Sequence, residues 1–360
     1  MTRDEALALI ASGEPLRDLD LCGVDLHEAD LGGVILDGCA LRGANLQGSK
    51  LVEATLSRCD LAGAKLAFAN LHHTVLHETR FAEVDFAGAD LTLTKLVKCD
   101  GAGARIQRQR LLATTFVECD LSRASFAGTE LDRVVIHQCS LIETDFTGAS
   151  LQRATLVEAD LSRAVLTLVR MKQAVLVGAR LAGQRLQELD LSGTQLAKAD
   201  LTDCDLSRAI LVQCNFQEAC LHGAKLDGAD VQRALLSEAD LQGASFDGAD
   251  LRQSIFQAVR ARGARFVRAR MEQAIFRDAT VDDASFAGSA LAYADFSYAS
   301  ARGADFTGAG LFRTRFHQTK GVADVLGSRP EALGDDEALA EAERAAAERV
   351  SRQPSAGGLK

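Results

Sequence analysis

The chain of 360 residues contains no tryptophan, two tyrosines and only three prolines. None of the prolines lies between Pro15 and Pro330, so this long segment keeps every backbone N–H that a hydrogen-bonded ladder needs. No apolar run approaches the length of a membrane-spanning helix, and we therefore expect no membrane association. Residues 1–16 include acids and lack the basic start of a secretion signal, which predicts a cytoplasmic protein.

Motifs that carry known chemistry are also missing. The nine cysteines include no Cys-x-x-Cys pair, which argues against structural zinc and favours reduced thiols. The sequence has no GxSxG, no P-loop, no HExxH and no dinucleotide-binding glycine pattern. We therefore predict that the protein is not an enzyme, has no catalytic residues and binds no metal or cofactor. Its net charge of −10 is mild for this length, and we expect no direct nucleic-acid binding.

What the sequence does contain is one unbroken period of five residues. A large apolar residue stands at every fifth position from Leu16 to Phe316, and only Gly101, Ala261 and Ala301 depart from Leu, Phe, Ile, Val or Met. A small residue usually precedes each large one by two positions, and Asp or Asn often precedes it by one. No insertion breaks the register, so we expect one continuous array without an internal linker or a second domain.

A period of five excludes the ordinary regular elements. In an α-helix each step of five rotates by about 140°, so the large residues would form no common face. In a straight strand an odd step sends alternate large residues to opposite faces. All of them can point inward only if the chain turns once per repeat. The small and the large residue of each unit are then buried, and the residue between them faces outward.

Stretches such as GANLQGSKL (43–51) and EADLQGASF (238–246) resemble the pentapeptide-repeat family, whose unit reads A(D/N)LXX. The resemblance covers about residues 16–320. It implies an all-β fold, a right-handed quadrilateral β-helix in which four units, or 20 residues, form one coil. This length would hold about 15 coils, and at ~4.8 Å per coil the solenoid would be on the order of 70 Å long.

Residues that are 20 apart should stack on one another in such a coil. Two kinds of interior column are predicted from this spacing. Thr79 fills the gap in a cysteine column made of Cys39, Cys59, Cys99, Cys119 and Cys139. Two phenylalanine ladders run through the C-terminal third: Phe246, Phe266, Phe286 and Phe306, and opposite them Phe256, Phe276, Phe296 and Phe316. Large side chains beside small ones would bring this narrow core to native density.

Both ends of a solenoid expose strand edges that must be covered. Thr2 and Glu5 form a capping box, so residues 1–15 are predicted to be an N-terminal capping helix. Residues 16–320 are assigned to the β-helix, and residues 321–352 to a C-terminal loop and helix. Residues 353–360 are expected to be a disordered tail.

One side of the middle coils carries an almost uncharged, β-branched surface that only Lys95 interrupts. We call this surface the strip; its residues are Val75, His77, Val97, Thr115, Val117, Val135, His137, Thr155, Val157, Val175 and Val177. β-Propensity would favour such residues on any side, and therefore does not explain why one side is selected. A contiguous apolar patch usually marks an interface, here with a second copy of the chain or with another protein.

Two other clusters are candidate binding sites. The first is a basic patch without acids, made of Arg260, Arg262, Arg265, Arg268 and Arg270. It could bind phosphate or an acidic protein, but solvated arginines around one coil would give the same sequence, and no aromatic platform accompanies them. The second cluster, His72, His73 and His77, is expected on adjacent sides that point apart, which favours a solvated surface over a metal site.

These observations predict a non-enzymatic scaffold or adaptor that presents an elongated surface to another protein, whose identity the sequence does not give. Some bacterial members of the family it resembles are associated with effector loading or secretion, which extends the hypothesis to that process. The alternative is a DNA-mimicking inhibitor or protector of type II topoisomerase (gyrase), as other members are. Against it, one side carries Arg80, Arg180 and Arg260 together with a column of aspartates, so the acidic column is interrupted; the aspartates are Asp20, Asp60, Asp100, Asp120, Asp160, Asp200 and Asp240.

Overall fold

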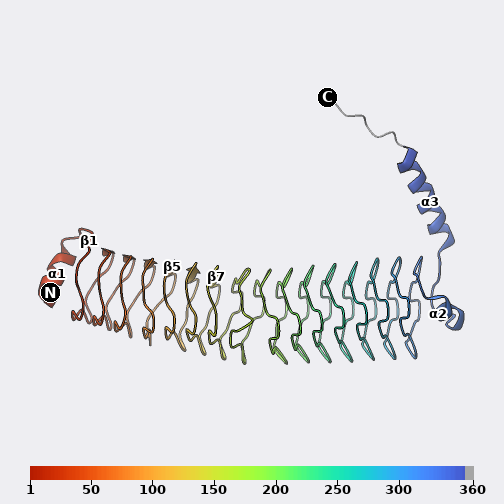
Figure 1. Ribbon diagram of the computed structural model, residues 1–360, viewed down its shortest axis with the longest axis horizontal. Helices are drawn as coiled ribbons and strands as arrows, with labels where there is room; N and C mark the ends of the chain where they lie inside the picture. The colour runs from red at the N-terminus through yellow and green to blue at the C-terminus, as the bar shows by residue number, and fades with distance from the viewer. Residues whose placement is uncertain (353–360) are drawn as a thin grey trace.

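The computed structural model describes residues 1–352, and Figure 1 shows them as a rod of stacked coils with helices at both ends. Helix α1 (Arg3–Ala11) lies at the N-terminal end. Helices α2 (Ala323–Ser328) and α3 (Glu337–Arg352) follow the last coil. Residues 353–360, the expected disordered tail, lie outside the described residues.

The coils pair with one another at a constant offset of 20 residues. The strands are β1 (Leu16–Arg17), β2 (Ile35–Asp37), β3 (Thr55–Ser57), β4 (Val75–His77), β5 (Lys95–Val97), β6 (Thr115–Val117) and β7 (Val135–His137). They form one parallel sheet in chain order, and Leu36, for example, lies beside Leu56. Single parallel bridges with the same offset form the other sides and continue to Ser300 and Lys320. The expected four-sided parallel β-helix is confirmed.

The interior is built as the period of five requires. Within a unit such as Ala159 to Leu161, the small and the large residue are buried and Asp160 between them is exposed. The predicted phenylalanine ladders are present: the rings of Phe256 and Phe276 stack with centroids 4.4 Å apart. Rings of opposite ladders meet edge to face, and such aromatic contacts add to the free energy gained by burial.

The cysteine column coincides with a change in the corners of the coil. At an ordinary corner a backbone hydrogen bond closes a four-residue turn. For example, the Val24 amide donates to the Leu21 carbonyl at 3.2 Å. In the cysteine column the Cys119 amide instead donates to Cys139 Sγ at 3.4 Å, and the Cys59 amide to Thr79 Oγ1 at 3.4 Å. These open corners leave room for the three-residue strands β2–β7 on that side, whereas beyond β7 the corners close and single bridges replace strands.

Both ends of the β-helix are covered. At the N-terminal end α1 begins with the expected Thr2–Glu5 capping box and buries Ala6. At the other end the Leu333 amide donates to the Thr314 carbonyl at 2.8 Å, which adds one more segment to the last coil. The short helix α2, which the sequence analysis did not separate from its loop, follows the buried Val322. Covered ends prevent the end-to-end stacking that open strand edges invite.

Helix α3 is anchored to the last coils by its first turns. His317 is fully buried; its Nδ1 accepts the Asp336 amide at 3.1 Å, so its Nε2 carries the proton and faces the Glu343 carboxylate at 3.4 Å. The Tyr298 hydroxyl also donates to Glu343. The hydrogen bonds that the Glu343 carboxylate accepts from Tyr298 and His317 hold the pKa of Glu343 below its usual range. In Figure 1 the strands lie along the upper side of the rod, and α3 rises above that side at the opposite end.

Candidate interaction surface

The strip lies where the sequence places it, on the side of the rod that carries strands β4–β7. Its first column runs from Val75 through Lys95, Thr115, Val135 and Thr155 to Val175, each residue paired with the next. Its second column begins at His77, Val97, Val117 and His137 in the same strands, and Val157 and Val177 continue it at the same offset. The side chains of the two columns flank a buried row of large residues.

The side chains of the strip are less exposed to solvent than those of an open apolar patch would be. Its uncharged residues are half-buried, and only Lys95 is exposed. None of its valines reaches the 42% exposure of Leu235 farther along the same side. A partner that contacts the strip therefore also contacts the corner residues on both sides of it.

The same column continues past the strip in a way that the sequence analysis missed. After the polar pair Gln195 and Asn215, it carries three aliphatic residues, Leu235, Ile255 and Ile275, paired in register. Following the offset of 20 beyond Val175 would have found them. The apolar surface on this side is therefore longer than the six coils first assigned to it.

The basic patch carries little free charge. Its arginines lie at successive sides of one coil, and four of the five face an aspartate of a neighbouring coil. The pairs are Arg260–Asp240 (3.4 Å), Arg262–Asp283 (3.1 Å), Arg265–Asp247 (2.6 Å) and Arg270–Asp250 (3.2 Å). Arg268 has no ion-pair partner among the side chains that the structure describes, those of residues 1–345. The patch is thus a set of exposed ion pairs, and such pairs attract an anion less strongly than free arginines do.

Some members of the aspartate column are paired with arginines in the same manner. Asp100 lies 3.4 Å from Arg80, and Asp160 lies 3.4 Å from Arg180. Because arginines and uncharged residues interrupt the aspartates, this side lacks the unbroken row of negative charge that duplex DNA carries.

Three of the nine cysteines, Cys22, Cys204 and Cys214, lie in environments that disfavour the thiolate. Burial raises the pKa of Cys204 and of Cys214 to about 12, so both stay protonated at neutral pH. Cys22 is exposed, but its hydrogen bond to the Asp20 carboxylate raises its pKa. A thiol is a nucleophile only as the thiolate, so these environments disfavour reaction.

The histidine cluster does not converge on a metal. The rings of His72 and His73 meet edge to face with centroids 4.5 Å apart, and His77 instead faces Glu78 at 3.7 Å. Among residues 1–352, no three His, Cys, Asp or Glu side chains are placed to hold a metal ion together. In the same part of the chain, no helix is both long and apolar enough to cross a membrane.

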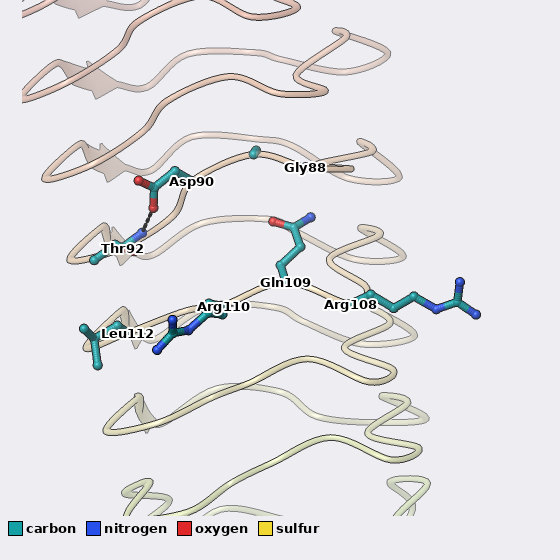
Figure 2. A pocket seen from close by; sticks show the side chains of 8 residues that line it. Gly88, Asp90, Thr92, Arg108, Gln109, Arg110 and Leu112 are labelled. Carbon is teal, nitrogen blue, oxygen red and sulfur yellow. Dashed lines mark hydrogen bonds between the residues drawn. The ribbon is translucent and has the colours of Figure 1, made fainter.

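A hollow of about 440 Å³ lies beside the coil of Ile106, and Figure 2 shows its lining. Arg108 and Arg110 point away from each other in this view, so they would not converge on one anion. Gln109 stands at a position that small residues normally fill; its Nε2 donates to the Phe86 carbonyl, and its Oε1 is buried without a partner. Because that oxygen is enclosed, a ligand in the hollow could not reach it, and the hollow carries no site.

Comparisons with known proteins agree with the repeat architecture. No curated protein matches the chain. Among solved structures, HetL from the cyanobacterium Nostoc sp. strain PCC 7120, a pentapeptide repeat protein involved in heterocyst differentiation regulation, is 25% identical; the match covers 58% of this chain and 89% of HetL with a TM-score of 0.30. QnrB1, a plasmid-mediated fluoroquinolone resistance protein, is 20% identical over 54% of this chain and 98% of its own, with a TM-score of 0.32.

The family described as pentapeptide repeats matches residues 39–96 and 129–320. These ranges make up more than half of the chain, and they fall within the segment where the coils pair at an offset of 20. The chain belongs to the pentapeptide-repeat family.

Proposed function

We propose that the protein is a non-enzymatic interaction scaffold, and that the strip is the surface through which it binds another protein. The process that we propose, by analogy with some bacterial family members, is the loading of secreted effectors. A rod of similar coils has no need to keep one side almost free of charge along successive coils, because any outward residue type would fit the same backbone.

The observation that supports this proposal is the register of the strip. Its second column, from His77 to Val177, carries no Lys, Arg, Asp or Glu over six coils, and Lys95 alone interrupts the first, whereas the neighbouring sides carry paired charges such as Arg80–Asp100. A flat, uncharged and half-buried surface between charged sides is the composition that the centre of a protein interface needs.

The proposal is tested by placing carboxylates in the strip. We expect the double variant Val117→Asp with Val157→Asp to fold, because Asp37 already occupies the equivalent position of β2. We also expect it to lose self-association or partner capture by more than about 100-fold, since each carboxylate would be desolvated at the interface. Sedimentation equilibrium and affinity capture with mass spectrometry are the measurements, and thermal unfolding followed by circular dichroism checks the fold.

A matched control is available on other sides of the rod. Val165, which is 42% exposed, and Val267, which is half-buried, also face outward, on the side opposite the strip. The variant Val165→Asp with Val267→Asp adds the same charge without touching the strip or the two corners beside it, so it should keep full binding. If the strip variant retains both its oligomeric state and its partner, the strip is only a strand surface and the proposal is wrong.

Topoisomerase inhibition is the competing function, and the paired charges disfavour it. Because arginines interrupt the aspartate column and lie 3.4 Å from Asp100 and from Asp160, we expect no inhibition of gyrase supercoiling at micromolar protein. Inhibition that disappears when Asp100, Asp120 and Asp160 are changed to Asn would reverse the order of the two proposals. A supercoiling assay with wild type and this triple variant measures it.

A further inference from the structure

The two corners that border the strip side carry opposite charge. At one corner, the left-handed position of each coil from His73 to Arg313 carries no acid; we call these positions the basic edge, and its polar residues are Arg133, Arg153, Gln173, Gln213, Arg233, Gln253, Gln273 and Arg313. The preceding position of the same turn carries two acids, Glu272 and Asp132, and Asp132 lies 3.0 Å from Arg153. The other corner, the acidic edge, carries Glu78, Glu118, Glu158, Glu218, Glu238 and Asp278. Its two lysines lie near acids of the same edge: Lys98 is 3.9 Å from Glu118, and Lys198 is 3.6 Å from Glu218.

In two coils between His73 and Gln318 the edges carry opposite formal charges, and in the others at most one edge is charged. Within each coil the basic-edge residue comes five positions before the acidic-edge residue, so Arg153 shares its coil with Glu158, and Arg233 with Glu238. In the coils from Glu53–Arg58 to Arg313–Gln318, all within the described residues, no coil carries the same charge at both edges. Arg233 and Glu238 have no ion-pair partner of their own among the side chains described for residues 1–345; Arg233 Nε donates to Gln253 Oε1 at 2.9 Å.

We propose that the strip side binds a second copy of this chain, with the two rods parallel and a two-fold axis running along them between the two strips. The inference rests on the proposed function, because it names the partner of the strip. In this arrangement each coil meets the same coil of its partner. The rotation brings the basic edge of one copy against the acidic edge of the other on both sides of the apolar surface.

Charge complementarity selects the parallel orientation over the antiparallel one. A two-fold axis across the rods would place each edge against itself, so arginines would face arginines and glutamates would face glutamates. Like charges at an interface oppose association, whereas opposite charges favour it and fix the register. The parallel arrangement also sets the half-buried column of Thr155 and Val175 against the partner's column of Val157 and Val177.

An exposed aromatic pair points to the same arrangement independently. Tyr293 on the basic edge is 52% exposed and Phe312 beside it is 54% exposed, with ring centroids 5.5 Å apart. Tyr298, which lies five positions after Tyr293 on the opposite edge, anchors α3 through Glu343. In the parallel dimer the aromatic pair of one copy therefore lies across from the point where the other copy's α3 leaves the rod, and that α3 would cover rings that the isolated chain leaves in water.

The test uses two single variants that repel themselves and attract each other. Arg233→Glu places glutamate against glutamate twice in its own dimer, and Glu238→Arg places arginine against arginine twice. Since an exposed ion pair changes binding by a modest factor, we expect each variant alone to dimerise about tenfold more weakly than wild type. In an equimolar mixture both contacts become Glu–Arg pairs, so heterodimers should form with nearly wild-type affinity. Sedimentation velocity gives the dissociation constants, and energy transfer between two fluorescent labels detects heterodimers.

The controls reverse charges at the same kind of corner on the far side of the rod. Arg123 and Glu83 share the left-handed backbone of the edge residues, with φ of 58° and 61°, so Arg123→Glu and Glu83→Arg should leave dimerisation unchanged. A wild-type chain that remains monomeric at 100-fold the concentration used for partner capture would overturn the proposal. So would weakened single variants whose mixture is not restored, because that result means the edges do not face each other.

The same experiments separate this inference from the proposed function. If Val117→Asp with Val157→Asp abolishes capture of another protein while the wild-type chain is monomeric, the strip is an interface but its partner is not a second copy. If the charge variants behave as expected, the strip side is a self-association surface, whatever other proteins the rod binds.

Discussion

Leu161→Asp is expected to prevent soluble folding. Leu161 is fully buried, and its stacked neighbours Leu141 and Leu181 are buried as well, so a carboxylate at this position meets apolar side chains on both adjacent coils. The substitution removes a large apolar side chain and buries a charge without a partner, which together cost at least about 4 kcal/mol. Coils of a solenoid are held by their neighbours, so the loss should interrupt the array in its middle. The soluble fraction on expression and urea unfolding followed by circular dichroism measure the effect.

The same substitution seven residues later is the control. Leu168 stands at a corner, is 73% exposed and has a φ of 55°, a backbone region that Asp tolerates better than Leu does. Leu168→Asp should therefore change the free energy of unfolding by less than about 0.5 kcal/mol. A soluble Leu161→Asp protein with wild-type unfolding would contradict the inward register on which every other assignment rests.

Most of the fold could be predicted from the period of five, because this period is a steric requirement at every unit. A large residue can be buried at each fifth position only if the chain turns once per unit, and the offset of 20 then follows from the four sides that the family resemblance implies. The cysteine column and the phenylalanine ladders were predictable from that offset alone. The strip was predictable in the same way, and its continuation through Leu235, Ile255 and Ile275 could have been.

Features that depend on atomic fit were not predictable. The open corners in the cysteine column arise from where an amide finds its partner, and Cys204 and Cys214 occupy ordinary closed corners, so a thiol by itself does not open a corner. The pairing of the basic patch with aspartates depends on side chains from neighbouring coils reaching each other. Helix α2 has only six residues, and its sequence carries no side-chain cap, which leaves too weak a signal for a helix.

Gly101 is the clearest case of a residue that the period alone leaves unexplained. It occupies a position where Leu, Phe, Ile, Val or Met is the rule, and its backbone does not require glycine. A Cβ atom at Gly101 would lie 2.3 Å from Cε2 and 2.6 Å from Cζ of Phe81, the stacked residue of the preceding coil. The Phe81 ring therefore fills the volume that a large residue at position 101 would occupy.

Restoring the regular repeat at this site should consequently destabilise the protein. We expect Gly101→Leu to lower the free energy of unfolding by about 3 kcal/mol, because the core there is already full and Phe81 is completely buried. Phe81→Leu alone should cost about 1–2 kcal/mol through the cavity that it leaves above Gly101. The double variant stacks leucine on leucine, as most of the column does, and should be more stable than Gly101→Leu alone by about 2 kcal/mol. Urea unfolding of the four proteins gives this coupling directly, and additive effects of the two substitutions would show that the ring and the glycine do not share one volume.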